Sequence, residues 1–182
     1  MVKRCEWAQK ENFREYHDKE WGKPVHDDKI LFEFLILEGA QAGLSWDTIL
    51  KRRETYGKAY GNFDVEKIAK YNEKDKARLL GDVGIIRNRL KIKSSIENAN
   101  HFIEIQEEFG SFNDYIWRFV NNKPIDNKFK SIKELPATTE ISDVISKDLK
   151  KRGFSFVGTT IIYAFMQAVG MVNDHEVDCV FR

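Results

Sequence analysis

Cysteine and proline are scarce in this sequence of 182 residues, which contains 2 cysteines and 3 prolines. Two cysteines are too few for the disulfide-rich scaffold of a small secreted protein, and so few prolines leave long stretches in which helices can continue. No apolar run approaches the roughly 20 residues of a membrane-spanning helix, and no apolar segment of signal-peptide length follows the basic residues near the N-terminus. We therefore expect a cytoplasmic protein with no membrane partner, in which Cys5 and Cys179 stay reduced.

Net charge is also nearly absent, because 30 Lys and Arg residues are balanced by 29 Asp and Glu residues. This balance excludes no class of partner, since an enzyme that acts on nucleic acid needs a basic face rather than a basic average. Aromatic residues are abundant: 13 Phe, 6 Tyr and 4 Trp can supply both a core and a ligand site. The length fits one ordinary domain. We expect a single domain over residues 1–182 and a monomer.

Helical patterns dominate the chain, and no segment shows the sustained alternation of apolar and polar residues that is typical of a strand. Residues 28–38 are apolar on nearly every face, which predicts a helix buried in the middle of the domain. Residues 76–105 predict two helices joined by a tight turn at 81–84, and residues 159–170 predict a last apolar helix. The one long connection, residues 122–139, predicts a surface loop. The fold class that follows is all-α.

Two cysteines and two histidines near the two ends of the chain form a candidate metal site: Cys5, His17, His175 and Cys179. His175 and Cys179 are four residues apart, so they share one face if the tail is helical. Two thiolates and two imidazoles suit a closed, structural Zn²⁺ site that would join the ends and contribute to folding. The alternative is two unrelated buried thiols and two ordinary histidines, because spacing does not show the tertiary contact.

The segment 79–87 resembles a helix-hairpin-helix element, in which glycines allow a tight turn between two helices. Backbone N–H groups at the start of the second helix can then approach DNA phosphates. The basic residues that follow can supply charge: Arg87, Arg89, Lys91 and Lys93. The alternative is an ordinary turn beside a solvated basic face. Turn and charge together predict DNA binding through phosphates, without reading of the base sequence.

The segment 37–46 holds the densest set of residues suited to a ligand pocket. Glu38 closes a strongly apolar helix, where a carboxylate is costly unless it has a partner or a task. Glycines follow it, and Trp46 adds a flat aromatic face. Tyr16 and Trp21 lie near His17, so a metal site would bring them close to the chain ends. The alternative is that Glu38 binds backbone amides and the aromatic residues pack in the core.

These features occur in blocks that extend over nearly the whole chain. The blocks are Arg4-Cys5-x-Trp7, Tyr16-His17-Asp18-x-Glu20-Trp21-Gly22, Leu37-Glu38-Gly39, Gln41-Ala42-Gly43-Leu44-Ser45-Trp46, Gly84-Ile85-Ile86-Arg87, Lys150-Lys151-Arg152-Gly153-Phe154, Phe156-Val157-Gly158-Thr159-Thr160, Phe165-Met166-Gln167-Ala168 and Val172-Asn173-Asp174-His175. In this order they resemble the 3-methyladenine DNA glycosylase I family, the constitutive bacterial type. One departure is Ala40, where the family pattern has a bulkier polar residue. Ala40 lies two residues past Glu38, a position that can affect the rim of the pocket but not its floor, and the sequence does not determine the effect.

The resemblance implies a helix-hairpin-helix glycosylase fold whose N- and C-terminal segments are joined by one structural Zn²⁺. The implied zinc ligands are Cys5, His17, His175 and Cys179. The implied base pocket consists of Glu38, which contacts the damaged adenine and is the catalytic candidate, with Tyr16, Trp46, Trp21 and Trp7. The implied DNA contacts are Gln41, Gly43, Leu44, Gly84 and Arg87, of which Gln41 and Leu44 are candidates for filling the gap that the base leaves.

The implied activity is base-excision repair of alkylated double-stranded DNA, with free 3-methyladenine as the product. Methylation at N3 makes adenine cationic, so an electron-rich aromatic pocket with one carboxylate attracts it more than the normal base, once the base has left the stack. No Asp occurs between Asp82 and Asp114, and no Lys within 38–46. We therefore predict a monofunctional hydrolase that leaves an abasic site uncut. The alternatives are a non-catalytic helix-hairpin-helix DNA-binding module and a zinc-stabilised scaffold with no DNA role.

Overall fold

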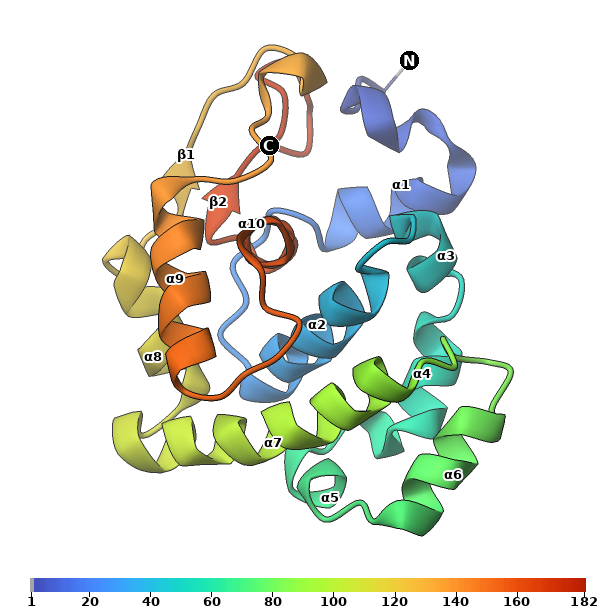
Figure 1. Ribbon diagram of the computed structural model, residues 1–182. Coiled ribbons are helices and arrows are strands. Elements are labelled where there is room, and N and C mark those ends of the chain that lie inside the picture. Colours follow the sequence, from blue (N-terminus) through green and yellow to red (C-terminus); the bar gives the residue numbers. More distant parts are fainter. Residues whose placement is uncertain (1) are drawn as a thin grey trace.

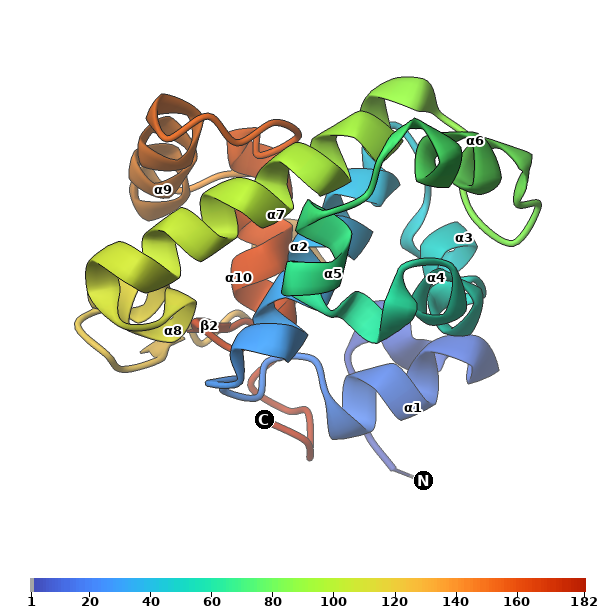
Figure 2. The ribbon, with the colours of Figure 1, turned by 90° about the horizontal axis from the view of Figure 1, so that it is seen from below.

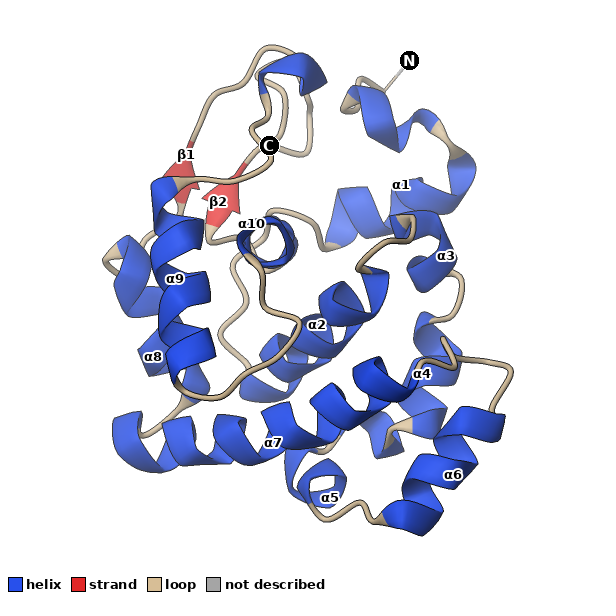
Figure 3. Cartoon of the chain, in the orientation of Figure 1, coloured by secondary structure: helices blue, strands red, loops and turns tan. Residues whose placement is uncertain are grey.

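Helices account for most of the computed structural model, which describes residues 2–182 (Figure 3). The α-helices are α1 (Glu11–Lys19), α2 (Asp28–Gln41), α3 (Trp46–Leu50), α4 (Arg53–Ala59), α5 (Val65–Ala69), α6 (Glu73–Gly81), α7 (Arg89–Phe109), α8 (Phe112–Trp117), α9 (Glu140–Lys151) and α10 (Thr159–Ala168). Short 3-10 helices are η1 (Glu6–Gln9), η2 (Gly61–Phe63), η3 (Arg118–Val120) and η4 (Ile132–Glu134). No helix among these residues is both long and apolar enough to cross a bilayer.

The central helix is α2, as its apolar sequence predicts. Asp27 caps its first turn by accepting a hydrogen bond from the Ile30 backbone N–H. Nine of its residues, from Leu31 to Ala40, are buried, and it packs against α7, α8 and α10. The Phe32 and Phe102 rings meet edge to face between α2 and α7, with centroids 5.0 Å apart. Figure 1 shows α2 between α10 and the long α7.

The predicted hairpin is confirmed as α6 and α7, although the turn extends to Asn88. Asp82 accepts a hydrogen bond from the Gly84 N–H at 2.8 Å, which tightens the turn. The preceding helix α4 supports it: Thr55 Oγ1 donates to the Gly84 carbonyl at 2.6 Å, and the Ile86 N–H donates to the Tyr56 hydroxyl at 3.1 Å. Seen from below, α5 and α6 lie beside α7 (Figure 2). The turn is therefore held by its own hydrogen bond between Asp82 and Gly84 and by two hydrogen bonds to α4.

Two short strands were not predicted. β1 (Ile125–Asp126) pairs in parallel with β2 (Val172–Asn173). A strand of two residues is too short to show an alternating pattern, which is why an all-α fold was expected; the mainly helical fold itself is confirmed. The pair fixes the long connection 122–139 to the segment after α10, so that connection is more than a surface loop.

The two ends of the chain lie on the same side of the molecule in both views (Figures 1 and 2). The Val180 backbone N–H donates to the Lys3 carbonyl at 3.1 Å, and the Glu6 N–H donates to the Glu176 carboxylate at 2.9 Å. After β2 the tail consists of turns and contains no helix. The helical i, i+4 geometry considered for His175 and Cys179 is therefore wrong, and tertiary contacts bring the two ends together.

Candidate active site and metal centre

A cleft of about 200 Å³ lies where η1, α1, α2, α3 and α10 meet. It is lined by Trp7, Tyr16, Trp21, Glu38, Gln41, Trp46, Leu135, Ala164 and Gln167. All five residues that the sequence predicts for a base pocket line this one cleft. A groove of about 350 Å³ shares Glu38, Gln41 and Ala164 with it and continues along 42–44. The cleft therefore opens toward the segment that follows α2.

Aromatic rings form the walls of the cleft. The Tyr16 and Trp46 ring centroids are 5.3 Å apart at an angle of 49°. Trp7 meets Trp21 edge to face at 5.0 Å and lies 6.4 Å from Tyr16. Ring faces carry partial negative charge, so a cation between these walls is attracted to them. The arrangement suits a flat, positively charged ligand.

Within the part of the chain that the structure describes, Glu38 is the one acidic residue that lines the cleft, from the last turn of α2. Its side chain is 4% exposed, and its Oε2 has no hydrogen-bond partner within residues 2–182. Burial raises the pKa of Glu38 to about 8, because desolvation disfavours the charged form. The indole Nε1 of Trp46 is buried without a partner as well. A carboxylate and an N–H group left unpaired in one cleft indicate that a ligand supplies the missing partners.

The segment after α2 presents the residues predicted to contact DNA. Gln41 lines both the cleft and the groove, and Leu44, 41% exposed, lines the groove. Gly43 has a φ of +75°, and a Cβ built on it would meet no heavy atom within 4 Å, so its role is conformational. In the hairpin turn, Gly84 packs against Thr55 and Arg87 is exposed.

Lys91 lies in α7 but turns toward the cleft segment. Its Nζ donates to the Ala40 carbonyl at 2.8 Å and the Ala42 carbonyl at 2.7 Å, at the C-terminal end of α2. A cation at this end of a helix compensates the free carbonyls. Ala40 is 4% exposed and faces Ser94 and Ser95 of α7, and it lines neither cleft nor groove. Ala40 therefore lies outside the rim of the pocket.

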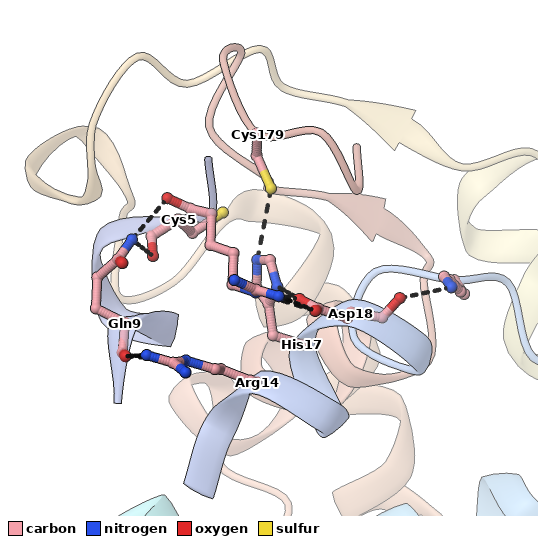
Figure 4. A network of polar contacts seen from close by, with 8 residues as sticks. Cys5, Gln9, Arg14, His17, Asp18 and Cys179 are labelled. Carbon is pink, nitrogen blue, oxygen red and sulfur yellow. Dashed lines mark hydrogen bonds and ion pairs between the residues drawn. The ribbon is translucent and has the colours of Figure 1, made fainter. Parts of the chain in front are cut away.

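Three of the four predicted metal ligands form a buried cluster. The candidate ligand atoms of Cys5, His17 and Cys179 lie within 4.8 Å of one another, and Cys179 Sγ is 3.6 Å from His17 Nε2 (Figure 4). His17 Nδ1 is 2.8 Å from the Asp18 carboxylate, which Arg4 holds from the other side at 2.7 Å. With Nδ1–H bonded to Asp18, the lone pair of Nε2 faces the sulfur atoms.

His175 lies beside this cluster without belonging to the group of three. Its ring centroid is 4.9 Å from that of His17, and its Nδ1 is 3.0 Å from Asn173 Oδ1. Its Nε2 is buried with no partner. Burial lowers the pKa of His175 to about 4, so its ring is neutral. Gly22 is needed at this point, because a Cβ there would lie 2.7 Å from the His175 ring.

Sequence reasoning missed three residues that line the cleft: Leu135, Ala164 and Gln167. Gln167 belongs to one of the sequence blocks, and a glutamine near the end of the apolar helix α10 is a signal that could have found it. Leu135 gives no such signal. It lies between η4 and Pro136 in the long connection, and only the tertiary fold brings it to the cleft.

Among the residues that the structure describes, the helical fold and the aromatic cleft with one buried acidic side chain suit a protein that binds a flat cationic ligand. Residues 7–182 match the methyladenine glycosylase family, and the chain belongs to that family. It is 49% identical to DNA-3-methyladenine glycosylase 1 of Escherichia coli (strain K12) over 179 residues, 98% of this chain and 96% of that protein. It is 47% identical to DNA-3-methyladenine glycosylase of Haemophilus influenzae (strain ATCC 51907 / DSM 11121 / KW20 / Rd) over 180 residues, 98% and 97% of the two chains.

A solved structure extends the comparison to a bound ligand. The Y16F variant of a 3-methyladenine DNA glycosylase I, in complex with 3-methyladenine, superposes with a TM-score of 0.94 at 34% identity. The match covers 98% of this chain and 96% of that one. The fold is therefore shared over nearly the whole length.

Proposed function

We propose that this protein hydrolyses the N-glycosidic bond of 3-methyladenine in alkylated double-stranded DNA, releasing the free base and leaving an abasic site. Family membership and the relatives' names support this activity. The observation that carries it is Glu38, a buried carboxylate without a partner between the aromatic walls of a cleft. A non-catalytic DNA-binding module has no need of such a costly group, and neither has a scaffold protein.

The positive charge of the substrate base explains both binding and selectivity. Tyr16 and Trp46 offer ring faces to the cation, and Glu38 accepts a hydrogen bond from its exocyclic amine. The cation offsets the desolvation of Glu38, so the carboxylate ionises when the charged base enters. Neutral adenine provides no such compensation, so Glu38 stays protonated and adds no ionic attraction to the normal base. Trp7 and Trp21 pack edge to face and extend the aromatic wall next to Tyr16.

The cationic base is already a good leaving group, so the enzyme needs little acid catalysis to break the bond. Glu38 and the ring faces hold the base while water attacks the sugar. The cleft lining among residues 2–182 contains no lysine, so no amine is available there to form a Schiff base and cut the strand. The proposed reaction therefore stops at the abasic site.

DNA is held by the hairpin and the segment after α2 in this proposal. The exposed Arg87 of the hairpin turn binds phosphate. The N–H groups of Gly84 and Ile86 are already bonded to Asp82 and Tyr56, so any backbone contact to phosphate comes from other residues of the turn. Leu44 and Gln41 occupy the space that the extruded nucleotide leaves in the duplex, and Gly43 lets the chain between them turn close to the DNA. The protein works as a monomeric single domain in the cytoplasm.

A structural Zn²⁺ bound by Cys5, His17, His175 and Cys179 completes the proposal. Two thiols and two neutral imidazoles, each with its Nδ1 engaged and its Nε2 available, are the donor set that Zn²⁺ prefers. Bound zinc would cross-link the two chain ends. The candidate zinc ligands also help to position the cleft. Each of Trp7, Tyr16 and Trp21 lies within five residues of Cys5 or His17 in the sequence.

Release of free 3-methyladenine from DNA treated with dimethyl sulfate, followed by chromatography, tests the proposed activity. Glu38→Gln should lower kcat/KM about 100-fold, since it removes a charged hydrogen-bond acceptor worth about 2–3 kcal/mol. Glu107→Gln, on the exposed face of α7, is the matched control and should be fully active. Equal activity of wild type and Glu38→Gln would exclude Glu38 as the residue that reads the base.

A further inference from the structure

Gln167 is a polar residue of the cleft to which the proposed function assigns no role. It lies in the last turn of α10 and lines the cleft together with Glu38 and Trp46. Its backbone carbonyl accepts a hydrogen bond from the Gly22 N–H at 2.9 Å, directly after Trp21. Its position is therefore tied to the aromatic wall as well as to its own helix.

The side-chain amide of Gln167 is held in one orientation by Asp174. Gln167 Nε2 donates to Asp174 Oδ2 at 2.8 Å. Asp174 is 1% exposed, and its Oδ2 also accepts from the Tyr163 hydroxyl at 2.6 Å. Its Oδ1 accepts from Asn127 Nδ2 at 2.7 Å. Since a carboxylate with three donors can only accept, the NH₂ group of Gln167 must face it.

The other polar atom of this amide, Gln167 Oε1, is available to accept a hydrogen bond from a ligand. Gln167 Oε1 accepts no hydrogen bond from residues 2–182, and it is not one of the buried unpaired atoms of the protein. Because Gln167 is half-buried at the cleft wall, the accessible side of this oxygen is the cleft. Turning the amide over would place Oε1 against Asp174 Oδ2, two acceptors in a buried site, and that is strongly unfavourable.

We propose that Gln167, fixed by Asp174, is a specificity-determining residue that selects a methylated adenine over a methylated guanine by presenting only a hydrogen-bond acceptor. This inference depends on the proposed function, because it concerns the choice between bases in the same cleft. Both 3-methyladenine and 3-methylguanine are cationic in DNA, so Glu38 and the ring faces attract both. Adenine offers an amine donor at position 6, whereas guanine offers an oxygen. Two acceptors, Glu38 and the locked Gln167, favour the amine and repel the oxygen.

The experiment measures the release of 3-methyladenine and 3-methylguanine from the same methylated DNA under single-turnover conditions. The wild type should release 3-methyladenine faster. Gln167→Met keeps the length of the side chain and removes the acceptor. It should slow the release of 3-methyladenine about five- to tenfold, the usual effect of one lost hydrogen bond, and should raise the release of 3-methylguanine, because the repelling acceptor is gone.

Asp174→Asn is the second variant and keeps the shape of the buried network. Its amide can donate to Gln167 Oε1, so that the NH₂ group of Gln167 can turn to the cleft and donate to the guanine oxygen. We expect 3-methylguanine release to rise and 3-methyladenine release to fall in this variant. A merely structural role of Asp174 would slow both bases equally and leave their ratio unchanged.

Gln106 provides a matched control outside the cleft. Its Nε2 also donates to a carboxylate, Asp28 Oδ2, at 2.7 Å, so Gln106→Met loses an equivalent hydrogen bond without touching the ligand. Its ratio of released bases should equal that of the wild type. If the wild type is active but the ratio of released 3-methyladenine to 3-methylguanine is unchanged in Gln167→Met or in Asp174→Asn, the proposed role of Gln167 is overturned. The proposed function is not affected by that result. Absence of 3-methyladenine release from the wild type would instead refute the proposed function.

Discussion

Glu38 should make the free protein less stable as the pH rises, and Glu38→Gln should remove that cost. The pKa of Glu38 is about 8 in the folded protein, where burial disfavours its charge, and about 4.3 for a glutamate in an unfolded chain. Between these values the folded protein retains a proton that the unfolded chain has lost. Stability therefore decreases as the pH rises through this window and levels off above the folded pKa.

The size of the effect follows from the two pKa values. Each unit of difference in pKa corresponds to about 1.4 kcal/mol. The wild type should therefore be less stable than Glu38→Gln by about 4 kcal/mol at pH 7 and about 5 kcal/mol at pH 9. Near pH 4 the glutamate is mostly protonated in both the folded and the unfolded state, so the difference should be close to zero. At pH 7 the melting temperatures should differ by about 10 °C for a protein of this size.

Urea denaturation of both proteins from pH 4 to pH 9, in the absence of DNA and free base, measures this difference directly. The candidate metal ligands and all other titrating groups are common to both proteins, so their contributions cancel. Glu107→Gln controls for the loss of one carboxylate at an exposed position. A difference that does not grow with pH would mean that Glu38 is paired or hydrated in the free protein. The reasoning from an unpaired buried carboxylate would then fail.

Two further predictions concern parts of the molecule outside the cleft. Cys179→Ser should lower the zinc content from about one ion per chain and destabilise the protein by about 2–5 kcal/mol, while activity per folded molecule stays within about threefold; metal analysis and thermal denaturation check this, and zinc-free protein of full stability would contradict it. Arg87→Ala should weaken binding to methylated and unmethylated duplexes alike and reduce the slope of log K against log salt by about one. An unchanged salt slope would remove Arg87 from the phosphate contacts.

The helices and the chemistry of the cleft could be predicted from the sequence because both depend on local patterns or on motif blocks. The apolar run of α2 predicted its burial, and blocks containing Tyr16, Glu38 and Trp46 predicted a shared pocket. Contacts between distant segments could not be predicted in this way. Leu135 and the pairing of β1 with β2 depend on where a long connection packs, and no local pattern records that.

The orientation of the Lys91 side chain toward the end of α2 could not be predicted from the local sequence either. A lysine among basic residues after a hairpin resembles its exposed neighbours in sequence, and only the position of the α2 carbonyls distinguishes it. The tail illustrates the same limit. A helical spacing was considered for His175 and Cys179, whereas backbone contacts with residues 3–6 determine its course. The chemistry of the residues predicted a cluster that the structure shows for Cys5, His17 and Cys179, while a metal ion bound there remains a proposal and the helical local structure considered for the tail was wrong.

The bonds from Lys91 to the end of α2 connect the hairpin helix directly to the backbone beside Glu38. A single charged side chain therefore holds the C-terminal end of α2 against α7, in addition to the packing between the two helices. Loss of this lysine would leave the Ala40 and Ala42 carbonyls without their donor, two and four residues past the point where the cleft carboxyl group is attached.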